Sequence, residues 1–101
     1  MSDGFYTLAS WHIQEGHEEE FLRIWKDELA PAFLTANPKA QGTLIQSLDD
    51  PRQFYSFGPW ESLEQMDAAR SDVEVRAAIG KLLAVCDRAT PGPYRVVLTI
   101  P

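Results

Sequence analysis

The chain has 101 residues, of which 45% are hydrophobic and 11% aromatic, and this composition suffices for one small globular core. Nine Lys and Arg against fifteen Asp and Glu give a formal net charge of −6, and no basic run interrupts the acidic balance. This charge argues against nucleic acid and anionic membranes as partners, and we expect a single domain over residues 1–101.

The cysteine and histidine content argues against a metal site and a disulfide. Cys86 is the only cysteine, and the two histidines lack the spacing of a zinc site. The amino end has no basic segment followed by an apolar run, and no stretch reaches the roughly 20 apolar residues of a membrane helix. We therefore expect an unprocessed protein of the reducing cytoplasm that needs no metal or other cofactor.

The first half of the chain predicts a strand followed by a helix. Residues 5–14 alternate in the manner of a strand, with Trp11 and His12 on opposite faces. Three glutamates after Gly16 suit the positive end of a helix, and apolar residues then recur at helical spacing to position 33. Pro31 should kink or restart this helix, and Asn37-Pro38 should end it.

A hairpin is predicted next. Residues 42–48 and 53–57 have strand composition, and the four residues between them suit a tight reversal. Gly58-Pro59 is expected to close the second arm, and Trp60 then stands where the strand passes to a helix.

The last third predicts two consecutive helices and a strand. Ser62 to Gln65 has the spacing of a capping box, and Ser71 to Glu74 repeats it, so a corner is expected near Ser71. The later helix should carry an apolar face from Val75 to Cys86. Thr90 to Pro93 should end it, and Tyr94 to Ile100 reads as a strand rich in β-branched residues.

This order predicts an α+β, ferredoxin-like βαββαβ domain with a four-stranded antiparallel sheet and helices on one face. Both sheet faces carry apolar residues, because Trp11, Ile13 and Phe54 lie on one side of their strands while Leu8, Tyr55 and Phe57 lie on the other. The face without helices needs a cover, and a second copy of the same sheet provides one. We therefore expect an obligate homodimer.

Three features resemble one family: a glycine opening a glutamate-rich first helix, the Asp-Asp-Pro hairpin, and Trp60-Glu61-Ser62 leading into the second helix. By these features the chain resembles the antibiotic biosynthesis monooxygenase domains of the dimeric α/β-barrel superfamily. The resemblance covers residues 6–100, and its most specific motif is Trp60-Glu61-Ser62. It implies a dimeric barrel, with chemistry that ranges from cofactor-free oxygenation of aromatic polyketides and quinols to haem degradation.

In the polyketide-type oxygenases the cleft uses the Trp of this motif, an Asn four residues before it, a Tyr six residues after it and an Arg on the following helix. The corresponding positions here are Trp60, Ser56, Met66 and, with a one-residue gap, Arg76. Met66 has no exchangeable proton, so a proton relay through that position is impossible. The haem-degrading branch needs a first-strand Asn and a helical His, where this chain has Ala9 and Ala77 or Ala78, so haem degradation is set aside.

Each candidate also has a purely structural interpretation. Trp60 would either stack on a ligand or plug the junction of strand and helix, and Arg76 would either bind an anion or flank the core in solvent. Trp11 and Trp25 are assigned to substrate binding in the same cleft, although core packing is their default role. His12 would be either a hydrogen-bonded polar group on the dimer side or a base.

The hypothesis favoured by the resemblance is a cofactor-independent monooxygenase that binds a flat phenolic or quinol molecule between sheet and helices. Trp60 and Arg76 would be the catalytic residues, and Ser56, Met66, Trp11 and Trp25 would bind the substrate. The alternative is a non-catalytic dimeric barrel that binds a small apolar ligand or merely associates. Loss of the Tyr at Met66 favours this alternative, whereas the presence of Trp60 and Arg76 favours the oxygenase.

Overall fold

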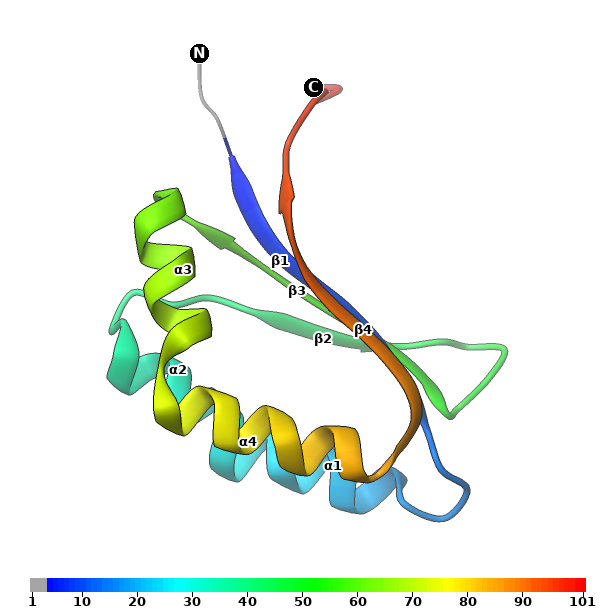
Figure 1. Cartoon of the computed structure of the whole chain (residues 1–101). Coiled ribbons are helices and arrows are strands. Elements are labelled where there is room, and N and C mark those ends of the chain that lie inside the picture. Colours follow the sequence, from blue (N-terminus) through cyan, green and yellow to red (C-terminus); the bar gives the residue numbers. More distant parts are fainter. Residues whose placement is uncertain (1–3) are drawn as a thin grey trace.

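A computed structural model describes residues 4–101 and shows a four-stranded antiparallel sheet with its helices on one face (Figure 1). The strand order β2-β3-β1-β4 is that of a ferredoxin-like α+β domain, so the predicted fold class is confirmed. Among residues 4–101, no helix combines the length and apolar character needed to cross a bilayer. The elements in chain order are β1 (Phe5–Ile13), α1 (Glu18–Ile24), the π-helical turn η1 (Trp25–Leu29), α2 (Ala30–Ala36), β2 (Thr43–Gln46), β3 (Gln53–Trp60), α3 (Leu63–Ser71), α4 (Val73–Ala84) and β4 (Cys86–Arg95).

The main core lies between the sheet and the helices. Alternate residues of β1, including Trp11 and Ile13, are buried, as the period of two predicts. The ring of Trp11 packs against Phe21 of α1, which in turn packs against Phe54 of β3. Full burial of side chains of this kind stabilises the fold by about 1.5–3 kcal/mol each, so the inner sheet face and α1 form one unit.

The first helical region changes its hydrogen-bond pattern in the middle. η1 separates α1 from α2, and the amide of Ala30 donates to the carbonyl of Trp25, five residues back. Pro31 lies in the first turn of α2, where its missing amide hydrogen breaks no bond. The predicted restart at Pro31 is therefore confirmed, and a π turn, which is often found at functional sites, accompanies it.

Strand β3 is longer than predicted. It continues through Gly58 and Pro59 to Trp60, with Gly58 opposite Thr7 of β1. The prediction that Gly58-Pro59 closes the strand is therefore wrong. The strand can continue through Pro59 because β2 pairs with β3 only as far as Phe57. Beyond Phe57, β3 has a neighbouring strand only on the β1 side, so its other side is a sheet edge where a proline is tolerated.

The last strand also departs from the prediction. β4 runs over Cys86–Arg95 instead of residues 94–100, and α4 ends at Ala84. β4 is an edge strand, and Pro91 and Pro93 are two residues apart, so both of their missing amide hydrogens face the same side. Prolines that face the open side break no ladder bond and prevent another strand from adding there.

Cys86 is therefore the first residue of β4, where it lies opposite Ile13, and does not belong to the apolar stripe of α4. The side chain is buried, and this burial, reinforced by the nearby Asp87 carboxylate, raises the pKa of the Cys86 thiol to about 11. The thiol is protonated at neutral pH, which makes it a poor nucleophile.

Side-chain caps fix the corner between the last two helices. The Ser62 hydroxyl accepts a hydrogen bond from the amide of Gln65, as predicted, although the Gln65 side chain bonds to Glu61 instead of returning to the cap. The next cap is Asp72, one residue after the predicted Ser71, and its carboxylate accepts from the amide of Val75.

The outer face of the sheet carries no helix (Figure 1). Register places Leu8 opposite Phe57 and Ile45 opposite Tyr55 on this face, so apolar side chains from neighbouring strands are adjacent. All are at least one third exposed. This outer face comprises the side chains of Tyr6, Leu8, Ile45, Tyr55, Phe57 and Tyr94.

Candidate functional site

A cavity of about 560 Å³ lies between the inner face of the sheet and the helices. All three tryptophans of the chain line it: Trp11 from β1, Trp25 from η1 and Trp60 from the end of β3. Trp11 and Trp25 meet edge to face with their ring centroids 6.3 Å apart, and Phe33 of α2 lies against Trp60 at 5.8 Å. A mainly apolar cavity of this size fits a small aromatic ligand.

Two hydroxyl groups hold two of these rings in place. Trp11 Nε1 donates to Ser56 Oγ at 2.9 Å, and Trp60 Nε1 donates to Thr7 Oγ1 at 3.1 Å. Ser56 is the only buried polar residue among residues 4–101, and both hydroxyls belong to residues that line the cavity. Each hydroxyl accepts an indole hydrogen, which leaves its own hydrogen available for a ligand oxygen.

The third indole has an unused donor. Trp25 Nε1 is shielded from solvent and has no hydrogen-bond partner among residues 4–101. A buried donor without a partner costs about 1–3 kcal/mol, so such a group calls for a functional explanation. Its neighbour Lys26 and Leu29 also line the cavity, so three of the five residues of η1 face it.

The charged residues at the cavity are both basic. Lys26 comes from η1 and Arg70 from the last turn of α3, and no Asp or Glu of the described residues 4–101 lines the cavity. Both side chains are exposed at the rim. The cavity therefore offers a positive rim to a ligand, although the chain as a whole has a formal net charge of −6.

Four of the six residues predicted from the sequence meet at this cavity: Trp60, Ser56, Trp11 and Trp25. The other two do not line it. Met66 is buried with Trp60 and Ala69 in a separate small cluster, and Arg76 is exposed on α4.

Sequence reasoning missed Arg70 and Thr7. Arg70 lies four residues after Met66 on α3, but Met66 is buried outside the cavity, so this spacing gave no signal for Arg70. The signal for Thr7 was the alternation of β1, which places Thr7 on the same inner face as Trp11.

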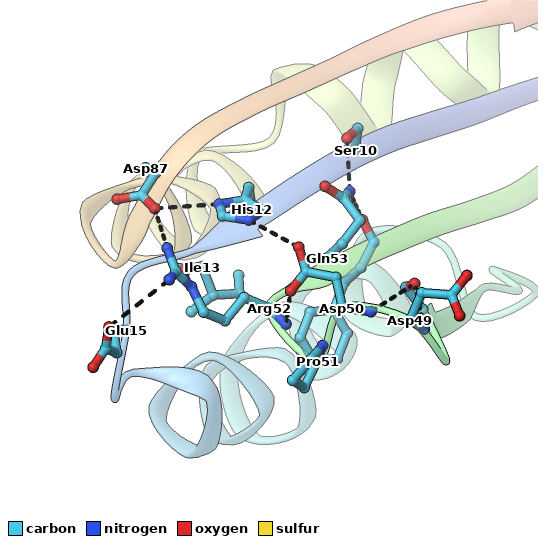
Figure 2. Close-up of polar contacts among 12 residues, drawn as sticks. Ser10, His12, Ile13, Glu15, Asp49, Asp50, Pro51, Arg52, Gln53 and Asp87 are labelled. Atoms are coloured by element: carbon cyan, nitrogen blue, oxygen red, sulfur yellow. Dashed lines mark hydrogen bonds and ion pairs between the residues drawn. The ribbon is translucent and has the colours of Figure 1, made fainter.

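A polar cluster lies at the far end of the sheet, around His12 of β1 (Figure 2). Its two ring nitrogens each lie 3.2 Å from a carboxylate oxygen, Nε2 from Asp50 in the hairpin turn and Nδ1 from Asp87 of β4. Arg52 contacts the same oxygen of Asp87 at 2.7 Å and donates from Nε to the carbonyl of Ile13. His12 is thus a hydrogen-bonded polar group that helps to tie the turn and two strands together.

Because of this cluster, we expect the free energy of unfolding to depend on pH in the acid range. The Arg52 amide, followed by His12, holds the pKa of Asp50 below its usual value. For Asp87, burial opposes ionisation, but hydrogen bonds from Arg52 and His12 outweigh it and lower the pKa. A lowered carboxyl pKa stabilises the fold above the unfolded pKa of about 3.9, and this stabilisation is lost as the pH falls through the folded value.

We predict that Asp87→Asn lowers the melting temperature by a few degrees at pH 7 and that the difference from wild type becomes smaller as the pH falls below the unfolded pKa of about 3.9. Thermal melts between pH 7 and 3 measure it. Asp67→Asn, on an exposed position of α3 without an ion pair among residues 4–101, is the control and should leave the curve unchanged. A constant difference between Asp87→Asn and wild type down to pH 3 would show that Asp87 acts by packing.

The fold and the cavity define a ferredoxin-like α+β protein with an aromatic cavity between sheet and helices. The sequence profile of the antibiotic biosynthesis monooxygenase family matches residues 4–81, so the chain belongs to this family. A search of curated proteins finds no significant match. Within residues 4–101, no group of three or more His, Cys, Asp or Glu side chains is arranged to hold a metal ion.

Solved structures share the fold at low sequence identity. SnoaB, a cofactor-independent oxygenase from Streptomyces nogalater, is 17% identical with a TM-score of 0.80 over 99% of both chains. A conserved protein from Methanosarcina mazei is 14% identical with a TM-score of 0.74 over 90% of both chains. A NIPSNAP family protein from Agrobacterium tumefaciens is also 14% identical, with a TM-score of 0.69 over 90% of both chains. These similarities establish the fold and leave the reaction to be argued from the cavity.

Proposed function

We propose that the chain is a cofactor-independent monooxygenase acting on an aromatic polyketide or quinol in the cavity between sheet and helices. The observation that carries the proposal is the cavity of about 560 Å³, which is lined by three tryptophans and by the hydroxyls of Ser56 and Thr7. Membership of the monooxygenase family and the fold shared with the oxygenase SnoaB support it.

In this proposal the aromatic rings hold a flat substrate, and the donors stabilise its deprotonated form. Trp60 and Trp25 would stack on the ring system or border it, while Ser56 and Thr7 would donate to the substrate oxygen on which negative charge develops. No Asp, Glu or His of residues 4–101 lines the cavity, so the substrate proton would leave to solvent. Hydrogen bonds to the anion lower the substrate pKa and make this loss easier.

The reaction needs dioxygen and no other oxidant. The substrate anion would transfer one electron to dioxygen. The resulting radical pair would combine at the carbon that lost its proton in an anthrone, or at a ring carbon that bears a hydrogen in a quinol, which loses its proton from oxygen. Loss of water from this adduct leaves a carbonyl, so one oxygen atom stays on the substrate and the other leaves in water. The protein would contribute orientation of the ring and exclusion of bulk water.

The active species is proposed to be a cytoplasmic homodimer. The apolar outer face has no cover in a single chain, and a two-fold related copy would bury it and complete a dimeric α/β barrel. The single buried cysteine suits a reducing compartment and supports the proposed cytoplasmic location.

A second candidate is a dimeric barrel that binds a small aromatic molecule without transforming it. Two placements favour it: Met66 stands where the polyketide-type oxygenases have a Tyr, and the side chain lies outside the cavity in a buried cluster. In the described part of the chain, no tyrosine lines the cavity in place of that Tyr.

The test is dioxygen uptake by the purified, metal-free protein with anthrone and with 1,4-naphthohydroquinone. We expect uptake above the spontaneous rate, with a loss of about tenfold or more in Trp60→Ala and Trp25→Ala, because each removes a wall of the cavity. Circular dichroism identifies variants that fail to fold, and Trp60→Phe retains the packing against Phe33 if Trp60→Ala is unfolded.

Glu64→Gln is the matched control, because Glu64 is exposed on α3 and does not line the cavity. It should oxidise both compounds at the wild-type rate. If folded wild-type protein consumes no dioxygen above the spontaneous rate with either compound, the oxygenase proposal fails and the binding protein is favoured.

A further inference from the structure

Hydrogen-bond donors dominate the polar side chains around the cavity. Lys26 and Arg70 carry only donors, and Trp25 Nε1 is a donor without a partner among residues 4–101. The hydroxyls of Ser56 and Thr7 already accept indole hydrogens, which leaves their own hydrogens free to donate. Among residues 4–101, Gln41 supplies the only side-chain amide oxygen in the lining. A ligand that matches this lining has to be rich in acceptors.

The charges around the cavity strengthen this bias. Ion pairs elsewhere in residues 4–101 use His12, His17, Arg23, Arg52 and Lys81, and neither Lys26 nor Arg70 has a carboxylate within 4.0 Å. None of the acidic side chains of residues 4–101 is among the lining residues. An acidic protein with two cations at this cavity that form no ion pair within residues 4–101 attracts an anion to the cavity and repels it elsewhere.

The two cations project from separate helical segments. Lys26 belongs to the π turn η1, beside Trp25, and Arg70 is near the end of α3, ten residues after Trp60. Both carry long, flexible side chains, which reach an anionic group at the mouth while the aromatic part of the same ligand lies deeper among the rings.

We infer that Lys26 and Arg70 are specificity-determining residues that select a planar aromatic acid, with its carboxylate at the rim and its ring among the tryptophans. The inference rests on the proposed function, because it assumes that the cavity is the ligand site. It goes further in naming the charge of the ligand. Neither residue touches the reacting carbon, so both act on binding and orientation.

The experiment is isothermal titration of the wild-type protein with 2-naphthoate and with its neutral isostere 2-naphthamide. We expect 2-naphthoate to bind about tenfold more tightly, with an affinity that falls as NaCl is raised. Arg70→Gln and Lys26→Gln should each remove most of this preference and leave the affinity for 2-naphthamide unchanged. Arg70→Lys, which keeps the charge, should retain a large part of it.

Arg76→Gln separates a local contact from a general charge effect, because it removes the same charge from an exposed position of α4 outside the cavity. It should keep the preference for 2-naphthoate. An equal loss in Arg76→Gln and Arg70→Gln would overturn the assignment, and so would equal binding of the acid and the amide by the wild type. Failure to bind either compound would also overturn it.

The oxygenase proposal has its own readout. Equal binding of 2-naphthoate and 2-naphthamide, accompanied by dioxygen uptake with anthrone, would reject the anion selectivity and leave the oxygenase standing. Selective binding of 2-naphthoate without any dioxygen uptake would support the selectivity and favour a binding protein.

Discussion

Replacing Gly58 by alanine is expected to lower the free energy of unfolding by about 3 kcal/mol or more. A Cβ atom at Gly58 would lie only 2.1 Å from the carbonyl oxygen of Gln41. This contact is with backbone, so no side-chain rotation relieves it, and the segment leading into β2 has to move. A loss of this size is a large part of the about 5–15 kcal/mol that stabilises a typical domain.

The same substitution should also affect the cavity, because Gln41, Gly42 and Gly58 all line it. Urea denaturation followed by circular dichroism measures the loss of stability, and titration with 2-naphthoate measures the loss of binding. Both should fall in Gly58→Ala.

Gly80→Ala is the matched control for Gly58→Ala. Gly80 lies inside α4, where a Cβ would meet no atom within 4 Å. Alanine is the better helix former, so this variant should gain about 0.5–1 kcal/mol. Equal stability of Gly58→Ala and wild type would show that the approach of Gln41 to Gly58 is looser than the structure has it.

The fold was predictable because the main elements are strongly periodic. The alternation in β1 identified its buried face, with Trp11 and Ile13 inward, and the caps at the third and fourth helices located their corner. The failures occurred at prolines. Pro59, Pro91 and Pro93 read as strand breakers, but each lies where a neighbouring strand is absent on one side. Whether a strand is at an edge depends on the whole sheet, which local rules do not describe.

The site was predictable only where the sequence pattern determines which side of the sheet a side chain faces. Trp60 and Ser56 are four residues apart on one strand, so both face the same side, and that side is the helix-covered one. The arginine depends instead on how α3 and α4 turn at Asp72 and pack on the sheet. That packing brings Arg70 to the rim and leaves Arg76 in solvent, which the gapped match to the family pattern did not anticipate.

The two faces of the sheet pose different physical problems. The inner face is covered by helices and still encloses a cavity, which suits a site from which bulk water is excluded. The outer face is apolar and uncovered in the single chain. Because β2 and β4 at its edges each pair with a neighbouring strand on one side only, we expect the rigidity of the cavity floor to depend on what packs against the outer face.

We predict that the wild-type protein is a homodimer in solution and that Tyr55→Glu converts it to the monomer of 11.4 kDa. Tyr55 lies on the outer face next to Ile45 and opposite Ser10 of β1, so a carboxylate there would be buried without a partner when two outer faces meet. Burying an unpaired charge costs several kcal/mol, enough to shift the dissociation constant by two or more orders of magnitude.

Multi-angle light scattering after size-exclusion chromatography gives the mass, and Leu63→Glu is the control. Leu63 is exposed to 44% and Tyr55 to 43%, so the two substitutions place the same charge at equally exposed positions, but Leu63 belongs to α3. Leu63→Glu should keep the wild-type mass because α3 lies on the opposite side of the sheet. A monomeric wild type would overturn the homodimer, whereas a dimeric Tyr55→Glu would place the interface away from the outer face.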